Sequence, residues 1–145
     1  MKVSDVITSK GSTEVFTITP DAPVSALLDE LDAHNIGALV VSEDGTHVSG
    51  IVSERDIVRK LRSTTDPLSQ PVSSIMTAEV HTCGPDDSVG ALLEIMTNAR
   101  IRHVPVVDED EVLVAILSIG DAVKFRMQQL QFERDQLNQY VASAR

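Results

Sequence analysis

Two short stretches of the sequence place a carboxylate three residues after a hydroxyl: Ser53-x-x-Asp56 and Ser118-x-x-Asp121. A Ser at the start of a helix with an acidic residue three positions later is close to a capping box, although that motif prefers Glu or Gln. The same helix terminus has free N–H groups and a positive dipole end, so it can bind an anion such as a phosphate. The carboxylate can accept hydrogen bonds from a ribose diol. Because both copies keep both residues, we favour a binding role over capping alone.

These two stretches belong to a longer internal repeat. Gly50 to Asp56 returns 65 residues later as Ala115 to Asp121. The same offset relates the apolar positions of the preceding segment, which are Val24, Leu27, Leu28 and Leu31 in the first copy and Val89, Leu92, Leu93 and Met96 in the second. A repeat of this size predicts two supersecondary units, each too small to bury its apolar face alone, that share a core.

Apolar periodicity predicts the order strand, helix, strand, strand, helix in each unit. The first helix would be capped by Asp21 or Asp86 and end near Asn35 or Arg100. The final helix begins at the hydroxyl of the motif. The predicted first strands cover 15–18 and 80–83, and the buried central strands cover 36–41 and 101–107.

Four segments follow from this reading of the chain. We interpret 1–62 as the first repeat, 63–71 as a polar linker, 72–123 as the second repeat and 124–145 as a helical extension. The N-terminal part of the first unit is four residues longer than that of the second, and we place the additional residues in a surface loop, where changes in length cost little.

The extension has an amphipathic pattern. Apolar residues recur at steps of three and four, interrupted by Arg134, and predict a helix to about Ala142; they are Val123, Met127, Leu130, Leu137 and Val141. The segment is too polar to be a stable helix alone. Two interpretations stay open: the helix packs against its own chain, or it pairs with a second subunit.

Composition argues against several classes of partner. The net charge is -10, from 22 acidic and 12 basic residues, which disfavours nucleic acid and anionic membrane surfaces. No apolar run approaches the roughly 18 residues of a membrane span. Met1 to Lys10 does not resemble a secretory signal, and the single cysteine, Cys83, cannot form an internal disulfide, so we expect a cytoplasmic protein.

Arg102 and His103 precede an apolar strand and could reach phosphate oxygens, although basic residues at this position are commonly surface residues. Their counterparts in the first unit, Gly37 and Ala38, carry no charge, so the two candidate sites would differ. Arg55, inside the first motif, could supply a cation to the other site.

Residues suited to catalysis or metal binding are not arranged for either role. The four histidines, His34, His47, His81 and His103, show no metal-ligand spacing. We interpret Cys83 as a small buried apolar residue and not as a nucleophile. The sequence contains no Gly-rich phosphate loop, nucleophile elbow or catalytic carboxylate pair. We therefore expect no enzyme activity, no metal and no obligatory cofactor.

The motifs GIVSERD and AILSIGD, together with IGALVV and IRHVPVVD, resemble the tandem CBS domain, named for cystathionine β-synthase, in its stand-alone bacterial form. The resemblance covers about residues 1–123 and includes the apolar helix of each unit and the turn before it. It implies an α/β fold of two βαββα repeats, related by a pseudo-twofold axis and packed through their small sheets. It also implies two clefts that bind adenosine compounds such as AMP, ADP, ATP, S-adenosylmethionine or NAD.

The resemblance assigns residues to each cleft. One cleft would hold the ribose with Asp121, the phosphates with Arg102 and His103, and the remaining parts with Ser118, Ile116, Thr17, Thr19, Ile36 and Gly37. The other would use Asp56, Ser53, Val52, Arg55, Thr82, Ile101 and Pro105. Because the second set lacks the basic pair, we expect a phosphorylated ligand in the Asp121 cleft in preference to the Asp56 cleft.

The leading hypothesis is a regulatory module that binds an adenine nucleotide between its repeats, senses energy state and signals to an effector protein. The resemblance also implies a homodimer. The alternative is a protein-interaction module with vestigial clefts, in which the acidic surface and the last helix bind another protein. An enzyme acting on nucleotides is least supported, because no catalytic set is visible.

Overall fold

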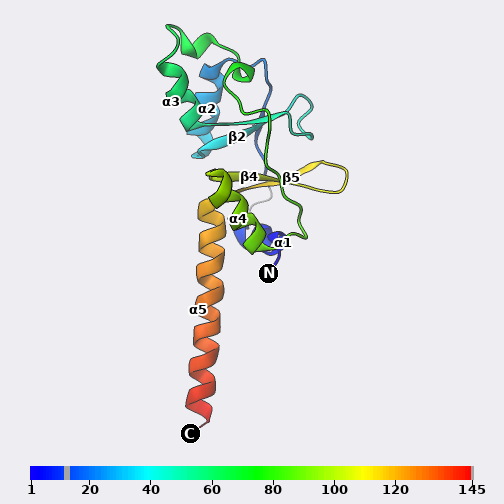
Figure 1. Ribbon diagram of the computed structural model, residues 1–145, viewed down its shortest axis with the longest axis vertical. Coiled ribbons are helices and arrows are strands. Elements are labelled where there is room, and N and C mark those ends of the chain that lie inside the picture. The colour runs from blue at the N-terminus through cyan, green and yellow to red at the C-terminus, as the bar shows by residue number, and fades with distance from the viewer. Residues whose placement is uncertain (12–13, 145) are drawn as a thin grey trace.

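The computed structural model describes residues 1–11 and 14–144, which form two small α/β units and one long helix (Figure 1). The first unit contains β1 (Thr17–Ile18), α2 (Val24–His34), β2 (Ala38–Val41), β3 (Gly50–Ser53) and α3 (Glu54–Leu61). The second contains α4 (Val89–Ala99), β4 (His103–Val107), β5 (Leu113–Ser118) and α5 (Ile119–Ser143). Helix α1 (Val3–Lys10) precedes the first unit, and the short turns η1 (Pro67–Ser69) and η2 (Val72–Ser74) connect the two. The predicted α/β fold class is confirmed.

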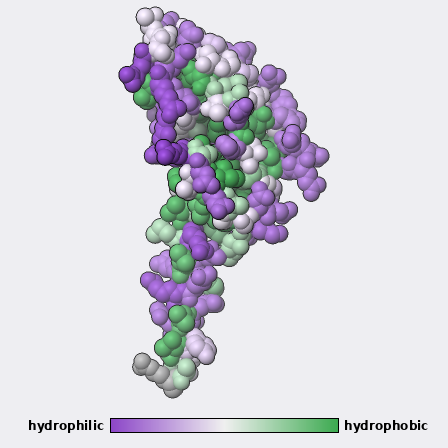
Figure 2. All heavy atoms as spheres, in the orientation of Figure 1, coloured by the Kyte–Doolittle hydropathy of each residue, from purple (hydrophilic) through white to green (hydrophobic). Residues whose placement is uncertain are grey.

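Helix α5 leaves the second unit and extends away from both sheets (Figure 1). Of its residues, Ala122 is buried in the core. The apolar residues that the sequence pattern identified along it are 44% to 64% exposed: Val123, Met127, Leu130, Leu137 and Val141. Figure 2 shows apolar patches alternating with polar ones along this helix. The helix therefore does not fold back on its own chain beyond its first turns, which removes the first of the two interpretations.

Each unit is built on a small sheet. In the first, β1 pairs with β2 in parallel and β2 pairs with β3 in antiparallel register, with Ala38 opposite Ser53. In the second, β4 and β5 are antiparallel, with His103 opposite Ser118. The strand predicted at 80–83 is reduced to a single bridge between Cys83 and Val106. Only Cys83 makes ladder contacts there, donating its N–H to Pro105 (3.1 Å) and accepting from Val107 (2.9 Å).

The first helix of each unit begins later than predicted. Its N-cap is Pro23 in α2 and Ser88 in α4, where the Ser88 hydroxyl accepts the N–H of Ala91 at 3.0 Å. The prediction that Asp21 or Asp86 caps these helices was wrong, because both residues lie in the preceding turns. The predicted ends were correct: Asn35 and Arg100 follow the helices in the left-handed conformation that commonly ends a helix.

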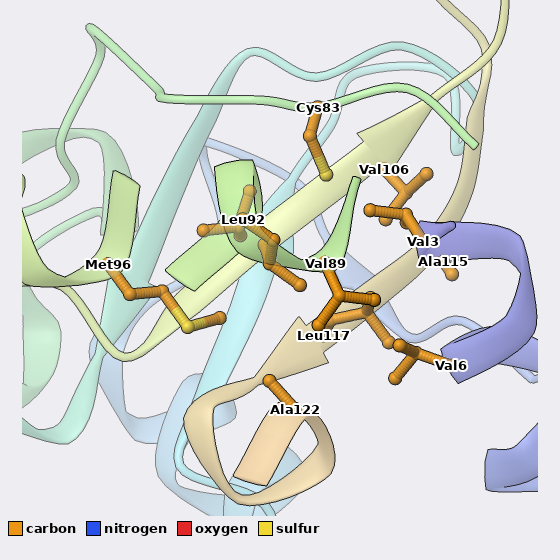
Figure 3. Packing of buried hydrophobic residues seen from close by; sticks show 11 residues of the cluster. Val3, Val6, Cys83, Val89, Leu92, Met96, Val106, Ala115, Leu117 and Ala122 are labelled. Atoms are coloured by element: carbon orange, nitrogen blue, oxygen red, sulfur yellow. The ribbon is translucent and has the colours of Figure 1, made fainter. Parts of the chain in front are cut away.

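The two units exchange their lead segments, by which we mean α1 for the first unit and η2 for the second. Val3 and Val6 of α1 are buried in the core of the second unit, and Val72 of η2 is buried in the core of the first. Figure 3 shows Val3 and Val6 among residues of the second core such as Leu117. Each unit therefore depends on the other to complete its core, as expected for repeats of this size.

Backbone hydrogen bonds repeat this exchange in both units. The N–H of Val3 donates to the carbonyl of Asp87 at 2.8 Å, and the N–H of Val72 donates to that of Ala22, also at 2.8 Å. Asp87 and Ala22 are equivalent positions of the 65-residue repeat. The two repeats are thus related by pseudosymmetry at the level of individual peptide groups.

Cys83 lies in the second core and is 5% exposed (Figure 3). Burial, with a smaller effect from the charge of Asp87, raises the pKa of its thiol to about 11. A thiol with this pKa is almost entirely protonated at neutral pH, so it is a poor nucleophile. The interpretation of Cys83 as a buried apolar residue is confirmed.

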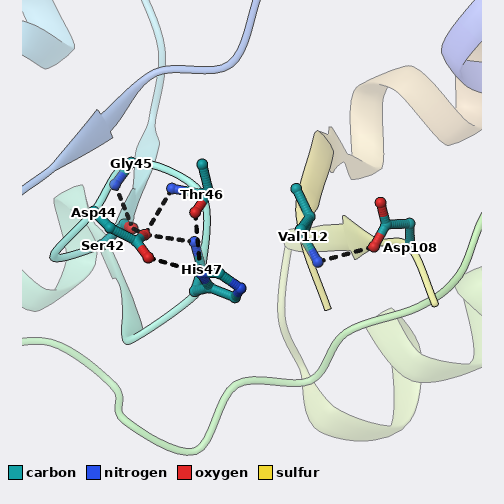
Figure 4. A network of polar contacts seen from close by, with 7 residues as sticks. All are labelled: Ser42, Asp44, Gly45, Thr46, His47, Asp108 and Val112. Carbon is teal, nitrogen blue, oxygen red and sulfur yellow. Dashed lines mark hydrogen bonds and ion pairs between the residues drawn. The ribbon is translucent and has the colours of Figure 1, made fainter. Parts of the chain in front are cut away.

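The hairpin loops of the two units also contact each other, and Figure 4 shows the polar contacts within each loop. The N–H of Leu113 donates to the carbonyl of Thr46 at 2.7 Å, and His47 bridges to Val112. Asp44 organises the first loop by accepting the N–H groups of His47 and Thr46, each at 2.8 Å, and these bonds hold the pKa of its carboxyl far below the usual range. The loop is thereby fixed in a shape that meets the other unit.

We predict that the packing of Met76 and Thr77 against β3 requires a glycine at position 50. A Cβ there would lie 2.6 Å from the sulfur of Met76 and 3.0 Å from the carbonyl of Thr77, which cross over β3. We expect Gly50→Ala to lower the free energy of unfolding by roughly 1–3 kcal/mol, as overpacking usually does, measured by urea denaturation. Gly90→Ala is the control, because a Cβ there meets only the Ser88 hydroxyl at 3.8 Å. Equal stability of Gly50→Ala and the parent chain would contradict the prediction.

Candidate functional site

A cavity of about 550 Å³ lies between the two units. The first unit contributes Gly37 and Ala38 beside β2 and a run from β3 into α3. The second unit contributes the segment after η2 and the residues that join α4 to β4. The site is therefore formed by both repeats and exists only when they are packed together.

Charged side chains are concentrated in this cavity. Its basic lining consists of four arginines and two histidines: Arg55, Arg59, Arg100, Arg102, His81 and His103. The acidic lining consists of Glu54, Asp56 and Glu79. In a chain with a net charge of -10, a local excess of arginine creates an environment suited to a phosphorylated ligand.

The capping boxes predicted at the two motifs are present. Asp56 Oδ2 accepts the backbone N–H of Ser53 at 2.8 Å and its hydroxyl at 3.2 Å. Asp121 Oδ2 accepts the N–H of Ser118 at 2.9 Å, and the Ser118 hydroxyl accepts the N–H of Asp121 at 3.1 Å. All hydrogen bonds described for these two carboxylates use Oδ2. Capping thus fixes the orientation of each carboxylate through Oδ2.

The structure brings together part of each predicted set. From the Asp56 set, Ser53, Arg55, Asp56 and Ile101 line the cavity. Val52 is fully buried in the first core, and Thr82 and Pro105 lie outside the lining. From the Asp121 set, Arg102, His103 and Gly37 line this same cavity, whereas Asp121, Ser118, Ile116, Thr17, Thr19 and Ile36 do not. The basic pair therefore shares its cavity with Asp56.

Several lining residues were missed by the sequence reasoning. Arg59 follows Arg55 by four positions, so both project from the same face of α3, and this spacing could have revealed it. Arg100 was considered only as the end of a helix, and nothing in the local pattern indicates that its side chain faces the other repeat. Glu79 and His81 come from an irregular segment without periodicity, so no local signal was available.

His103 lines the cavity and lies near enough to Asp121 and Glu54 to be affected by their charges. Its ring lies 3.5 Å from the position that a Cβ on Gly37 would occupy, which is an ordinary van der Waals distance, so the two repeats are in close contact here. Burial lowers the pKa of His103; the charges of Asp121 and Glu54 raise it in part, and those of Lys10 and Arg102 lower it again, so the net shift is downward. The imidazole is therefore neutral at physiological pH in this structure.

Asp121 has a cation beside it. Lys10 Nζ lies 3.2 Å from Asp121 Oδ2 and donates a hydrogen bond to the carbonyl of Ile116 at 3.0 Å. Burial raises the pKa of Asp121, but the hydrogen bond from the Ser118 N–H and the charge of Lys10 lower it, and the net shift is downward. The Asp121 carboxylate is thus ionised and paired.

We searched the described residues for a metal-binding cluster and for a membrane-spanning helix. Among residues 1–11 and 14–144, no group of three or more His, Cys, Asp or Glu side chains is placed to hold a metal ion. Within the same part of the chain, no helix has the length and apolar character needed to cross a membrane.

The fold and the motifs agree with comparisons to known proteins. The model of the CBS domain family matches residues 3–63 and again 72–128. The mitochondrial CBS domain-containing protein CBSX3 of Arabidopsis thaliana is 35% identical over 150 residues, which covers 96% of this chain and 71% of that protein. A crystal structure of a CBS-domain containing protein from Agrobacterium tumefaciens is 38% identical, with a TM-score of 0.81 over 87% of this chain and 99% of that one. The chain belongs to the CBS domain family and carries a tandem pair.

Similar structures include a CBS pair that was solved with adenosine compounds. The CBS domain pair of protein MJ0100 was solved in complex with 5′-methylthioadenosine and S-adenosyl-L-methionine. It is 25% identical to this chain, with a TM-score of 0.77 over 86% of this chain and 98% of that one. A CBS pair with this fold therefore binds adenosine compounds.

The lowered pKa of His103 predicts a pH effect on stability. The unfolded chain takes up a proton on this histidine as the pH falls below its ordinary pKa of 6.5, while the folded chain resists protonation until lower pH. The wild type should therefore lose stability below pH 6.5, and His103→Gln should lose less over the same range. Urea denaturation between pH 8 and pH 5 measures both. A difference between the two chains that is independent of pH would contradict this prediction.

Proposed function

We propose that this CBS pair is a regulatory module that binds an adenosine compound, with phosphates, in the cavity that contains Asp56. The observation that carries the proposal is the combination, in one cavity formed by both repeats, of an oriented carboxylate with Arg55, Arg59, Arg100 and Arg102. A carboxylate suits a ribose diol, and arginines suit phosphate oxygens. The ligands of the MJ0100 pair support the adenosine part.

Different parts of the cavity lining suit the phosphate and the base of such a ligand. Asp56 lies at the N-terminus of α3, where free N–H groups and the helix dipole also favour a phosphate. Ala38, Ile51 and Ile101 supply apolar surface for a base. The second repeat also contributes Arg100, Arg102 and His103 to the lining. A nucleotide would therefore contact both repeats at once.

Signalling follows from this shared contact. A ligand that touches both repeats favours the arrangement in which they are closed on it, and it shifts that equilibrium only by its differential affinity. Compounds with different numbers of phosphates would shift this conformational equilibrium to different extents. The module could in this way sense energy state and control an effector protein. A cytoplasmic location belongs to the same proposal and rests on the single buried thiol.

The ribose assignment can be tested with Asp56→Asn. Thermal unfolding would be recorded with and without millimolar AMP, ADP, ATP, NAD and S-adenosylmethionine, because a ligand at about 100 times its dissociation constant stabilises the native state by about 2.7 kcal/mol. We expect at least one compound to raise the midpoint of the parent chain and to lose that effect in Asp56→Asn. Asp29→Asn, on the exposed face of α2, is the control. The same rise in both variants would remove Asp56 from the site.

The phosphate assignment predicts a proton uptake. A bound phosphate beside His103 favours its charged form, so binding should raise its lowered pKa and draw a proton from the buffer near pH 6.5. Calorimetric titration with ATP in buffers of different ionisation enthalpy measures this uptake. It should disappear in His103→Gln, and an uptake of the same size in that variant would place the phosphates elsewhere.

A homodimer formed through α5 is a further part of the proposal. The exposed apolar residues of α5 repeat at the steps of a heptad, and Arg134 occupies one position of that seam. In a parallel pair, two copies of Arg134 would meet in one layer and repel. In an antiparallel pair centred near residue 132, each Arg134 lies opposite Leu130 and close to Glu133 of the partner subunit. The antiparallel arrangement therefore satisfies the charge.

Removal of the chain after Lys124 should abolish this association. We expect the truncated chain to sediment as a monomer at concentrations at which the full chain is a dimer. Glu133→Lys should weaken the dimer because it places a like charge near Arg134, whereas Glu109→Lys, in the second hairpin, should leave it unchanged. If the full chain is itself a monomer, α5 does not pair with a second copy. The alternative function, binding to another protein through α5, would then be favoured.

A further inference from the structure

We propose that Lys10 occupies the Asp121 cleft as an internal cation and thereby restricts each chain to one adenosine ligand, bound at Asp56. This inference rests on the proposed function, because it concerns the Asp121 motif, to which the family resemblance assigns a second cleft. It assigns a role to a residue of α1, which belongs to neither of the two motifs.

The contacts of Lys10 reach two groups that a nucleoside would use. Its ammonium lies 3.2 Å from Asp121 Oδ2 and donates to the carbonyl of Ile116 at 3.0 Å. The side chains of Lys10 and Asp121 are 33% and 23% exposed, whereas those of the surface pair Lys2 and Asp86 are 61% and 88% exposed. The Lys10 contact is thus partly shielded from solvent, where an ion pair is screened less.

Helix α1 holds Lys10 in this position. Val3 and Val6, on the same helix, are buried in the second core, and the N–H of Val3 is bonded to Asp87. Lys10 is the last residue of the helix, and Gly11 follows with a φ of 77°, which ends the helix there. The backbone that carries the ammonium is therefore anchored, so less conformational entropy is lost when the ion pair forms.

The equivalent place in the other repeat is different. There the carbonyl of Ile51 accepts the backbone N–H of Thr77 at 2.9 Å instead of an ammonium. The 69-residue relation between Val3 and Val72 places Glu79 at the position of Lys10. Glu79 lines the Asp56 cavity, and its carboxylate cannot form an ion pair with Asp56. Among the described residues, Asp56 has no ion pair.

Because of this difference in charge, the Asp121 carboxylate is paired with a cation, whereas, within the part of the chain that the structure describes, the Asp56 carboxylate is not. The 550 Å³ cavity reaches Asp56 and does not reach Asp121. At Asp121, a ribose diol would have to displace a cation that already satisfies the carboxylate and the nearby carbonyl. At Asp56, the acidic residue in the equivalent position leaves the carboxylate available. The pseudosymmetric pair is therefore asymmetric in binding.

The experiment counts ligands per chain. Isothermal titration with ATP, AMP and S-adenosylmethionine would be performed on the parent chain and on Lys10→Met, which keeps the apolar stem and removes the charge. We expect one site in the parent chain and two in Lys10→Met, with the second site lost in Lys10→Met/Asp121→Asn. Lys10→Gln provides a second neutral variant in case the first does not fold. Lys10→Arg, which keeps the charge, and Lys2→Met, which removes a surface cation, should each bind one ligand.

The possible results separate this inference from the proposed function. One site in both the parent chain and the neutral variants, or two sites in the parent chain, would overturn the role of Lys10 and leave the Asp56 site intact. A single site that appears only when Lys10 is neutral would support Lys10 and overturn the assignment to Asp56. Weaker binding in the neutral variants would show that Lys10 contacts the ligand, which also overturns the inference. Absence of binding in every chain would overturn both proposals.

Discussion

The exchange of lead segments is the interaction on which the rest of the structure depends. Val3 and Val6 complete the core of the second unit, and Val72 completes that of the first, so neither small sheet is covered by its own unit alone. This exchange fixes the two units against each other. The cavity between them is a consequence, because its lining comes from both. A contact made for packing therefore also determines the geometry of the candidate binding site.

The charge of the cavity contrasts with that of the whole molecule. A chain with a net charge of -10 gathers four arginines and two histidines around one cavity. The overall charge opposes nonspecific binding to polyanions such as nucleic acid, while the local charge favours a small phosphorylated ligand. Burial, with smaller effects from the charges of Lys10 and Arg102, lowers the pKa of His103, and a bound anion would raise it. In the proposed function, selectivity and the response to the ligand would therefore come from the same group of side chains.

The two repeats differ at a few positions, and in our proposal these differences give the two halves different roles. Gly50 is needed because Met76 and Thr77 cross β3, whereas Ala115 occupies the equivalent position in the other repeat. Lys10 and Glu79 differ in the same way, by their charge at equivalent positions beside the two motif carboxylates. The fold is nearly symmetric because its hydrogen bonds and cores are repeated. Its proposed chemistry is not, because single side chains at the interface differ.

The sequence by itself determined what depends on local pattern: the repeat, the alternation of strands and helices, the capping boxes at Ser53 and Ser118, and the long last helix. Periodicity and spacing are properties of a segment and can be read along the chain. Only the tertiary structure decided that Arg102 and His103 share a cavity with Asp56, and that Lys10 pairs with Asp121. The hydrogen bond from Lys10 to Ile116 joins residues 106 positions apart. Its existence depends on how α1 packs against the core of the second unit, and this long-range packing leaves no local trace in the sequence.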